Sequence, residues 1–246
     1  MTALLRTALA HVADLCWPRV CAVPECGGPV DRPGRHLCSR CHANLPWLEG
    51  GGACRVCGRT IPSEAPHDFV CDECRELRPA FEFARAAVRY TEPAARLVKD
   101  FKFRGALWLR DDLTDLLEAA VRAKLDASAI DLVVPVPLHF LRYIARGYNQ
   151  SAILAKALAA RLDRRFDASS IRRRRDTEHQ TRLSGKSARK KNIQDAFAVR
   201  RPENVRGRTI LLVDDVMTTG GTLSECAKPL IDAGAARVWC ATVARA

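Results

Sequence analysis

Nine of the 11 cysteines in this 246-residue chain lie within its first 74 residues, and eight of these form four closely spaced pairs. Three pairs have the spacing C-x2-C, and the first pair is C-x4-C. A C-x2-C turn directs two thiolates at one metal ion, and two such turns complete the tetrahedral four-thiolate shell that structural zinc prefers. The spacing therefore predicts two tandem zinc ribbons. Their ligands would be Cys21, Cys26, Cys38 and Cys41 in the first ribbon and Cys54, Cys57, Cys71 and Cys74 in the second.

The two predicted ribbons are related by an internal repeat. The first, third and fourth cysteines of the first set recur 33 residues later in the second set. In both sets a glycine follows the second cysteine, namely Gly27 and Gly58, at a position where such turns often require a positive φ. Cys16 lies five residues before Cys21, so an exchange of Cys16 for a ligand of the first ribbon stays open. Three histidines are alternative ligands that four thiols per site make unnecessary: His36, His42 and His67.

The predicted metal ions are structural rather than catalytic. A segment of about 60 residues builds too small a core to fold securely by itself. Zinc binding, which is worth about 10–16 kcal/mol in finger peptides, would supply the missing free energy. Four thiolate ligands leave no open coordination position for a substrate.

The N-terminal segment, residues 1–20, has apolar side chains at helical spacing, which predicts a short docking helix. Arg6, His11 and Asp14 interrupt it, so no apolar core of a secretory signal precedes a cleavage site. No apolar run approaches the roughly 18 residues that a membrane span needs. We therefore expect a cytoplasmic protein, in which reduced cysteines bind metal rather than form disulfides.

From about residue 80 onward, strand-like and helix-like patterns alternate. The expected strands are 86–90, 131–137, 209–213 and 238–243, and the expected helices are 93–103, 107–125, 149–162 and 223–233. Repeated strand–helix–strand units favour a parallel sheet with helices on both faces. The sequence thus predicts a double zinc ribbon over residues 21–79 and an α/β domain over residues 80–246.

The most informative stretch of the α/β domain runs from Ile210 to Thr222 and reads I-L-L-V-D-D-V-M-T-T-G-G-T. A hydrophobic strand delivers two adjacent carboxylates, Asp214 and Asp215, to the carboxyl end of the sheet, where ligands bind in open α/β folds. The small-residue loop that follows opens a helix, and its backbone N–H groups form an anion pocket. Carboxylates beside a phosphate cradle suit a ligand with both hydroxyls and a phosphate, as in ribose 5-phosphate. A solvated helix-capping turn is the alternative for a lone T-T-G-G.

This segment resembles the 13-residue signature of type I phosphoribosyltransferases at every position. The wider chain resembles the ComF family, competence-associated proteins that join an N-terminal double zinc ribbon to a phosphoribosyltransferase domain. Other stretches that match the family's pattern are 101–105 (F-K-F-R-G), 134–138 (V-P-V-P-L), 146–150 (R-G-Y-N-Q) and 177–184 (T-x-x-Q-x-x-L-S). The first cysteine pair, Cys21 and Cys26, departs from the pattern, because its spacing is C-x4-C where C-x2-C is usual.

The resemblance implies a type I phosphoribosyltransferase fold that binds phosphoribosyl pyrophosphate (PRPP). Asp214 and Asp215 would bind its ribose hydroxyls, directly or through Mg²⁺, and act in catalysis. Val136 and Pro137 occupy the place of the pyrophosphate-binding loop. The residues that would hold the 5-phosphate are Thr218, Thr219, Gly220, Gly221 and Thr222.

The net charge of +12 is concentrated in one stretch, since residues 171–210 contain 13 Lys and Arg against 4 Asp and Glu. Type I enzymes carry a mobile catalytic lid at this place. The resemblance therefore implies that Arg182, Lys190 and Lys191 close over pyrophosphate and exclude water. A solvated charged loop and a nucleic-acid contact are alternative interpretations. Aromatic residues are absent between Phe166 and Phe197, which removes a stacking platform for single strands.

Two functions follow from the resemblance. The first is a Mg²⁺-dependent phosphoribosyltransferase, a glycosyltransferase that transfers the phosphoribosyl group from PRPP to an unidentified acceptor in connection with competence and DNA uptake. The alternative is a non-catalytic, PRPP-sensing protein that binds single-stranded DNA or a protein partner of the DNA-uptake machinery. The metal complement would be two structural zinc ions, with magnesium accompanying PRPP.

Overall fold

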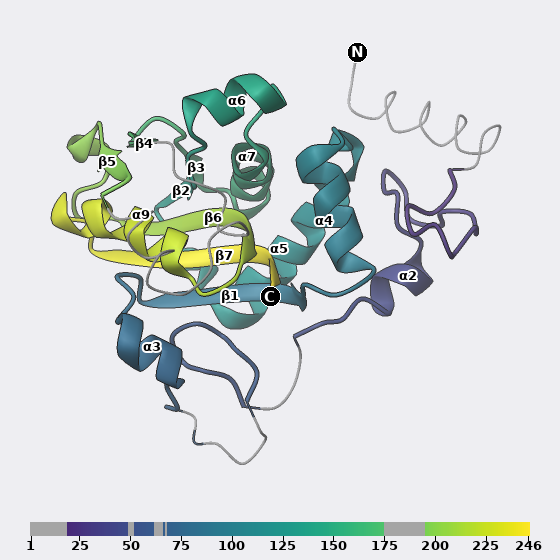
Figure 1. Ribbon diagram of the computed structural model, residues 1–246, viewed down its shortest axis with the longest axis horizontal. Coiled ribbons are helices and arrows are strands. Elements are labelled where there is room, and N and C mark those ends of the chain that lie inside the picture. The colour runs from purple at the N-terminus through teal and green to yellow at the C-terminus, as the bar shows by residue number, and fades with distance from the viewer. Residues whose placement is uncertain (1–18, 49–51, 62–65, 67, 175–194) are drawn as a thin grey trace.

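A single parallel sheet organises the chain. The computed structural model describes residues 19–48, 52–61, 66, 68–174 and 195–246 (Figure 1). Within these ranges, five parallel strands are arranged in the order β1-β7-β6-β2-β3. They are β1 (Phe83–Arg89), β2 (Leu132–Pro135), β3 (Arg165–Phe166), β6 (Thr209–Met217) and β7 (Arg237–Arg245). The predicted parallel sheet is confirmed, and the strand of the 13-residue segment lies at its centre.

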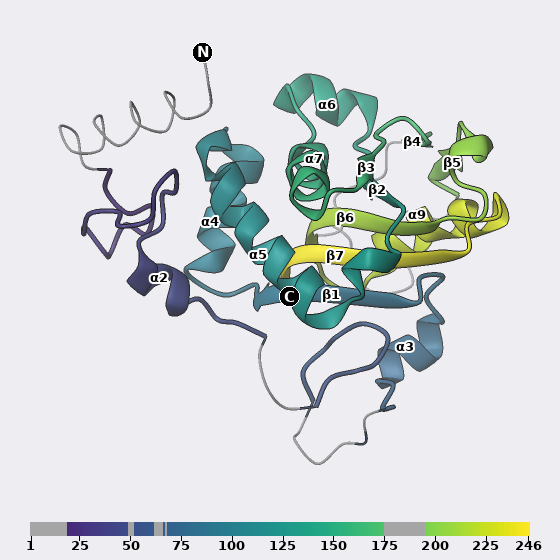
Figure 2. The same cartoon turned by 180° about the vertical axis from the view of Figure 1, so that it is seen from behind.

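Helices cover both faces of the sheet (Figures 1 and 2). Side chains alternate along the central strand, so that Leu211 and Val213 face one layer while Ile210 and Leu212 face the other. The first layer contains α4 (Ala94–Phe103), α5 (Arg110–Lys124) and α7 (Gln150–Leu162), and the second contains α9 (Gly221–Asp232). Burial on both faces explains why β2 and the first part of β6, residues 210–213, are continuously apolar.

Several expected elements have different bounds in the structure, and local contacts explain two of these differences. The strand expected to end at residue 213 continues to Met217, because β7 continues alongside it and pairs Met217 with Arg245. The helix expected over 107–125 divides into a 3-10 helix, η1 (Leu107–Leu109), and α5. The N–H of Arg110 bonds to the carbonyl of Leu107, three residues back, and this bond tightens the first turn.

Among the shorter local features, one prediction is confirmed and several elements were not predicted. Asn149 is the N-cap of α7, and its side chain accepts a hydrogen bond from the N–H of Ser151. The short helix α6 (Phe140–Arg146) was not predicted, and neither was the antiparallel pair of β4 (Ile171–Arg173) and β5 (Phe197–Val199). Elements this short carry too few residues to show a period.

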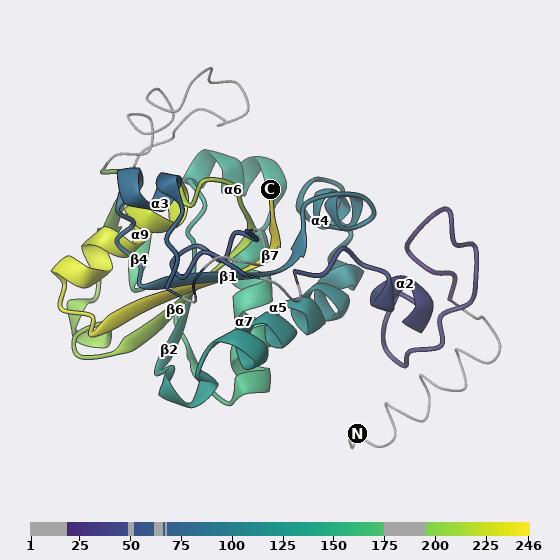
Figure 3. The ribbon, with the colours of Figure 1, turned by 90° about the horizontal axis from the view of Figure 1, so that it is seen from below.

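The two cysteine-rich segments lie at different places against the sheet and its helices (Figure 3). The first, which includes α2 (Ser39–Ala43), is joined to α5 by ion pairs from Arg32 and Arg35 to Asp115, at 2.6 and 2.7 Å. The second, which includes α3 (Asp72–Leu77), shares a buried cluster with α9 and the sheet face beneath it. Each segment therefore contributes to a different side of the core.

The stretch between the two segments pairs with β1. Trp47 forms an antiparallel bridge with Val88. The N–H of Leu48 donates to the carbonyl of Ala87 at 2.8 Å, and the N–H of Arg89 donates to the carbonyl of Pro46 at 2.8 Å.

The docking helix expected over residues 1–20 lies outside the described residues, except for Arg19 and Val20. Among the residues that the structure describes, no helix is both long and apolar enough to cross a membrane.

Asp112 joins the first cysteine-rich segment to α5 and yields a stability prediction. Its carboxylate, 2% exposed, accepts the N–H groups of His36 at 2.9 Å and Leu37 at 3.1 Å. Asp112→Ala leaves these donors unpaired, so we expect the free energy of unfolding to fall by about 1–3 kcal/mol. Urea denaturation with excess zinc measures it. Asp232→Ala, at an exposed position, is the matched control, and an equal loss in both variants would contradict the assignment.

Candidate functional site

Each set of four cysteines comes together as a closed cluster. In both sets the four sulfur atoms lie within 4.8 Å of one another. Cys26 Sγ and Cys38 Sγ are 3.7 Å apart, as are Cys57 Sγ and Cys71 Sγ. A tetrahedral shell with metal–sulfur bonds of about 2.3 Å has edges of about 3.8 Å. Both clusters therefore fit structural zinc with the ligands that the sequence predicts.

The internal repeat is reproduced in the backbone of the two clusters. The N–H of Cys38 donates to Cys21 Sγ at 3.5 Å, and the N–H of Cys71 donates to Cys54 Sγ at 3.3 Å. Cys38 and Cys71 are also the N-caps of α2 and α3. The third ligand of each cluster is thus positioned by the same combination of a helix start and an N–H···S bond.

The longer spacing of the first cysteine pair lengthens the turn between Cys21 and Cys26. The bridge between Val20 and Pro29 encloses the C-x4-C turn, whereas the bridge between Ala53 and Thr60 encloses a C-x2-C turn that is two residues shorter. The two extra residues lengthen the turn and leave Cys26 in the cluster.

The alternative histidine ligands lie elsewhere. His36 Nδ1 is 3.7 Å from a carboxylate oxygen of Asp112, and the ring of His42 packs edge-on against Trp47. Cys16 and His67 lie outside the described residues.

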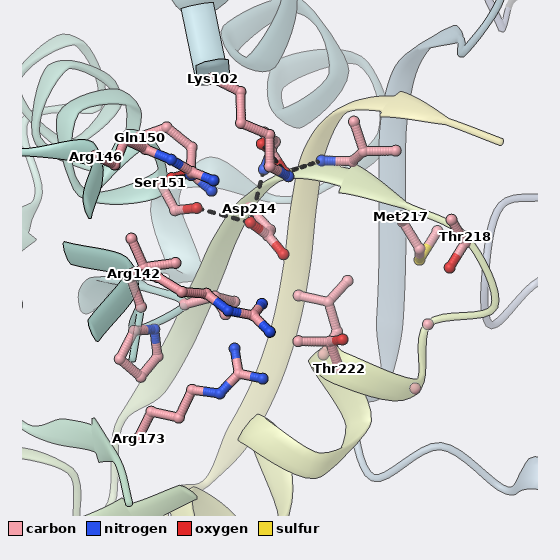
Figure 4. Close-up of a pocket in the computed structure, with 18 of the residues that line it drawn as sticks. Lys102, Arg142, Arg146, Gln150, Ser151, Arg173, Asp214, Met217, Thr218 and Thr222 are labelled. Atoms are coloured by element: carbon pink, nitrogen blue, oxygen red, sulfur yellow. Dashed lines mark hydrogen bonds and ion pairs between the residues drawn. The ribbon is translucent and has the colours of Figure 1, made fainter. Parts of the chain in front are cut away.

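A second candidate site lies at the carboxyl end of the parallel strands. A cavity of about 320 Å³ opens there, next to the ends of β2 and β6 and the first turn of α9 (Figure 4). Its charged lining consists of two carboxylates and four cations: Asp214, Asp215, Lys102, Arg142, Arg146 and Arg173. The excess of positive charge suits an anionic ligand.

The two carboxylates have different partners. Asp214 Oδ1 accepts hydrogen bonds from Ser151 Oγ at 2.7 Å and from the N–H of Asp215 at 2.9 Å. Asp215 is 2% exposed and pairs with Lys102 Nζ, which lies 2.7 and 3.0 Å from its two oxygens. α4 and α7 thus each supply one side chain that holds one carboxylate in place.

The surroundings of Asp214 make its carboxyl easier to protonate than that of an ordinary aspartate. Burial, together with the charge of Asp215, raises the pKa of Asp214 to about 7. Burial also works against the ammonium of Lys102, but the carboxylates of Asp215 and Asp214 outweigh it and raise the pKa of Lys102. Near neutral pH the Asp214 carboxyl therefore changes readily between its protonated and ionised forms, so a ligand can recruit it as an anion beside the Lys102–Asp215 contact.

The loop between β6 and α9 faces the same cavity. Thr218, Gly220 and the first residues of α9 line it, so the N–H groups that open the helix lie at the cavity wall. Gly220 adopts a φ of +82°, which residues with a side chain rarely adopt. The N–H of Gly221 donates to Thr219 Oγ1 at 3.4 Å. This arrangement provides a cradle for a phosphate group.

The opposite wall is formed by the end of β2 and the segment after it. Val136 and Pro137 line the cavity, and Asn149 Nδ2 donates to the carbonyl of Val136 at 3.2 Å. Arg142 extends into the cavity from α6, and Arg173 extends into it from β4 (Figure 4). These guanidinium groups provide donors for a second phosphate-like group.

Most of the predicted ligand-binding residues come together here. Those that line the cavity are Val136, Pro137, Asp214, Asp215, Thr218, Gly220, Gly221 and Thr222. Thr219 is in the loop but is not part of the lining. The three predicted lid residues lie outside the described residues: Arg182, Lys190 and Lys191.

The structure adds cavity residues to which sequence reasoning gave no role. Lys102, Arg146 and Gln150 belong to stretches 101–105 and 146–150, which match the family pattern, so the signal was present. Arg142 lies in α6, which was not predicted, and no motif marked it. Arg173 lies in β4, which was not predicted either, but it belongs to the basic stretch 171–210.

Comparison with known proteins agrees with this geometry. A family model described as a phosphoribosyl transferase domain matches residues 148–246. Competence protein F of Haemophilus influenzae is 32% identical over 226 residues, which cover 90% of this chain and 96% of the relative. The chain belongs to the ComF family.

Other members of the ComF family match over similar lengths. DNA utilization protein YhgH of Escherichia coli K12 is 33% identical over 83% of this chain and 95% of its own length. Competence protein ComFC of Bacillus subtilis is 26% identical over 83% of this chain and 82% of its own length. Together with the parallel sheet, the family match confirms the predicted type I phosphoribosyltransferase fold, joined to two N-terminal four-cysteine clusters.

The two clusters yield a prediction of metal content. We expect two zinc ions per chain, and one in Cys54→Ser/Cys57→Ser, because each cluster is closed by its own four thiolates. Mass spectrometry of the metals in purified protein measures it. Cys226→Ala removes a buried thiol outside both clusters and is expected to keep both ions. Retention of both ions in the double variant would refute the assignment.

The raised pKa of Asp214 yields a prediction of pH dependence. A carboxyl whose pKa is higher in the folded than in the unfolded state binds more protons when folded, so it costs stability as pH rises from about 4 to 7. Asp214→Asn removes this cost. In ligand-free protein with excess zinc, we expect the variant to gain in Tm relative to wild type between pH 5.5 and pH 8. A Tm difference that does not change with pH would contradict the shift.

Proposed function

We propose that this chain binds PRPP and transfers its phosphoribosyl group to an acceptor. The observation that carries the proposal is the placement of two adjacent carboxylates and a glycine-rich helix start in one cationic cavity. A ligand that fits it bears vicinal hydroxyls, a phosphate and a further anionic group, as PRPP does. The match of residues 148–246 to the phosphoribosyl transferase domain supports this choice.

Each end of the ligand has a partner in the proposed complex. Asp214 and Asp215 would accept hydrogen bonds from the ribose hydroxyls, and the loop from Thr218 to Thr222 would bind the 5-phosphate through its N–H groups. Val136 and Pro137 would lie along the pyrophosphate. The cavity carboxylates and the ligand's own oxygens are the donors that Mg²⁺ prefers, and Mg²⁺ would supply charge neutralisation of pyrophosphate.

The proposed reaction is a displacement at the anomeric carbon. The bond from this carbon to pyrophosphate oxygen breaks, and pyrophosphate leaves with the bonding electrons. A nucleophile of the acceptor forms the new bond to the same carbon and loses its proton. Arg142, Arg146 and Arg173 would stabilise the negative charge on the leaving group. We propose the same role for the predicted lid residues, Arg182, Lys190 and Lys191.

The acceptor is unidentified, but the relatives suggest where the activity is used. Their names, competence protein and DNA utilization protein, support a role in DNA uptake. They also support the alternative of a PRPP sensor that binds single-stranded DNA or a protein of the uptake machinery without turnover.

We place either function in the cytoplasm, where eight thiolates remain available to zinc. We also propose boundaries at 21–79 for the metal-binding unit and 80–246 for the phosphoribosyltransferase unit.

Binding and turnover of PRPP test the proposal. Calorimetric titration with PRPP and Mg²⁺ should detect binding, which Asp214→Asn/Asp215→Asn weakens about 10–100-fold or more, since charge-assisted hydrogen bonds are lost. Asp232→Asn, on the exposed end of α9, is the control. Release of pyrophosphate with a panel of nucleobase acceptors measures turnover. Binding without release on any acceptor would favour the sensor, and no binding would reject both functions.

The proposed lid yields a separate prediction. Lys190→Ala/Lys191→Ala should lower the rate of pyrophosphate release more than it lowers PRPP affinity, because these cations would act mainly on the leaving group. Steady-state kinetics compared with titration measures the two effects. An unchanged rate accompanied by a loss of DNA affinity would support the nucleic-acid interpretation of this stretch.

A further inference from the structure

The loop that lines the cavity rests on a residue next to the second four-cysteine cluster. A Cβ placed on Gly220 would lie only 3.4 Å from Cζ of Phe81 and 3.6 Å from Sδ of Met217. Phe81 is 3% exposed and is not one of the residues that line the cavity. The ring of Phe81 therefore packs against the turn at Gly220, where the proposed phosphate-binding loop leads into α9.

The segment that carries this ring is bonded to the helix that the loop opens. The N–H of Ala80 donates to Ser224 Oγ at 3.0 Å, and the N–H of Ser224 itself bonds to the carbonyl of Gly220. Only the short stretch from Arg78 to Pro79 separates α3, which contains Cys74, from Ala80 and Phe81. The position of the Phe81 ring thus depends on α3, the helix that carries Cys74 of the second cluster.

The turn that contains Cys54 and Cys57 of the second cluster is bonded to the start of β1. The N–H of Ala84 donates to the carbonyl of Val56 at 2.7 Å. Gly58 approaches so closely that a Cβ on it would lie 2.9 Å from the carbonyl oxygen of Ala84. A cluster held this tightly to the strand cannot shift without moving the residues that precede the strand, and Phe81 is one of them.

A third contact joins the second cluster to the end of the sheet. Arg245, buried near the C-terminus of β7, donates from Nη1 to the carbonyl of Cys57 at 2.9 Å. Its backbone pairs with Met217, the last residue of β6, and the N–H of Ala246 donates to the carbonyl of Met217 at 3.0 Å. The strand end from which the loop departs is therefore also tied to the turn that contains Cys57.

The first four-cysteine cluster has a different neighbourhood. Its segment is joined to α5 through Asp112 and Asp115, on the other layer of helices. Figure 3 shows α2 beside α4 and α5, and α3 at the end of the molecule where α9 lies. The two clusters, which repeat one another in sequence, thus differ in what they support.

We propose that the second four-cysteine cluster, when it holds its metal, positions the phosphate-binding loop through Phe81, and that the first cluster does not. Phe81 is then a positioning residue, which acts on a ligand only through Gly220 and Met217. Metal binding supplies much of the folding free energy of so small a segment. Loss of this metal would therefore free Phe81 from its position against Gly220. The claim about the ligand rests on the proposed function, whereas the claim about the order of the loop does not.

Amide hydrogen exchange of residues 217–224 tests the inference without any ligand. Cys54→Ser/Cys57→Ser should speed exchange in this peptide by about tenfold or more relative to wild type, and Cys21→Ser/Cys26→Ser should leave it unchanged. Exchange in α7 is the internal reference for global unfolding. Equal effects of the two double variants on residues 217–224 would overturn the proposal.

Phe81→Leu covers the case in which a cysteine variant does not fold. It should keep both zinc ions and the reference exchange of α7, and still speed exchange at residues 217–224. Phe83→Leu, in β1, is the control for loss of a ring nearby. Unchanged exchange in Phe81→Leu would also overturn the proposal.

Titration with PRPP and Mg²⁺ adds the functional readout. We expect Phe81→Leu to raise the Kd for PRPP several-fold and to leave the rate of pyrophosphate release at saturating PRPP nearly unchanged. If wild type fails to bind PRPP, the proposed function fails, while the exchange data still decide whether the second cluster orders the loop. If wild type binds and Phe81→Leu binds equally well, the positioning role fails alone.

Discussion

Two neighbouring carboxylates at the end of β6, the half-buried Asp214 and the buried Asp215, are the constraint around which the site is built. Adjacent negative charges at this depth are costly unless each has its own partner. Lys102 reaches Asp215 from α4, and Ser151 reaches Asp214 from α7, so two helices of one layer must pack correctly before the pair is compensated. The electrostatics of a few atoms therefore depend on the packing of the whole helical layer.

Local patterns in the sequence predicted a large part of the fold and of the site. The cysteine spacing indicated both metal clusters, and the segment from Ile210 to Thr222 indicated the central strand, the carboxylates and the loop, because each lies within a short contiguous stretch. The partners of the carboxylates were not predictable in this way. Lys102 is 113 residues from Asp215 in sequence, and only the topology of the sheet brings the two together. Arg142 was missed because the short helix that carries it shows no period, and the charge of the stretch 171–210 did not single out Arg173.

The duplicated cysteine segments show how similar sequences acquire different places in one fold. Both use an N–H···S bond to the first cysteine and a helix that begins at the third. The first is attached by charged groups to α5, whereas the second packs its buried cysteines into the apolar layer beneath β1 and α9. A duplication that preserves the metal shell leaves the outer surface of each copy free to change.

The pairing of residues 46–48 with β1 has a consequence for the chain before it is fully folded. β1 is an outer strand of the parallel sheet, and an uncovered outer strand offers a row of unpaired N–H and carbonyl groups to any other extended chain. Trp47 and its neighbours occupy that row, and they are held there from both sides by the two metal-binding segments. If the two clusters hold the zinc that they fit, metal binding would keep residues 46–48 on this edge, and a chain without zinc would leave the N–H and carbonyl groups of β1 unpaired even where its hydrophobic core had already formed.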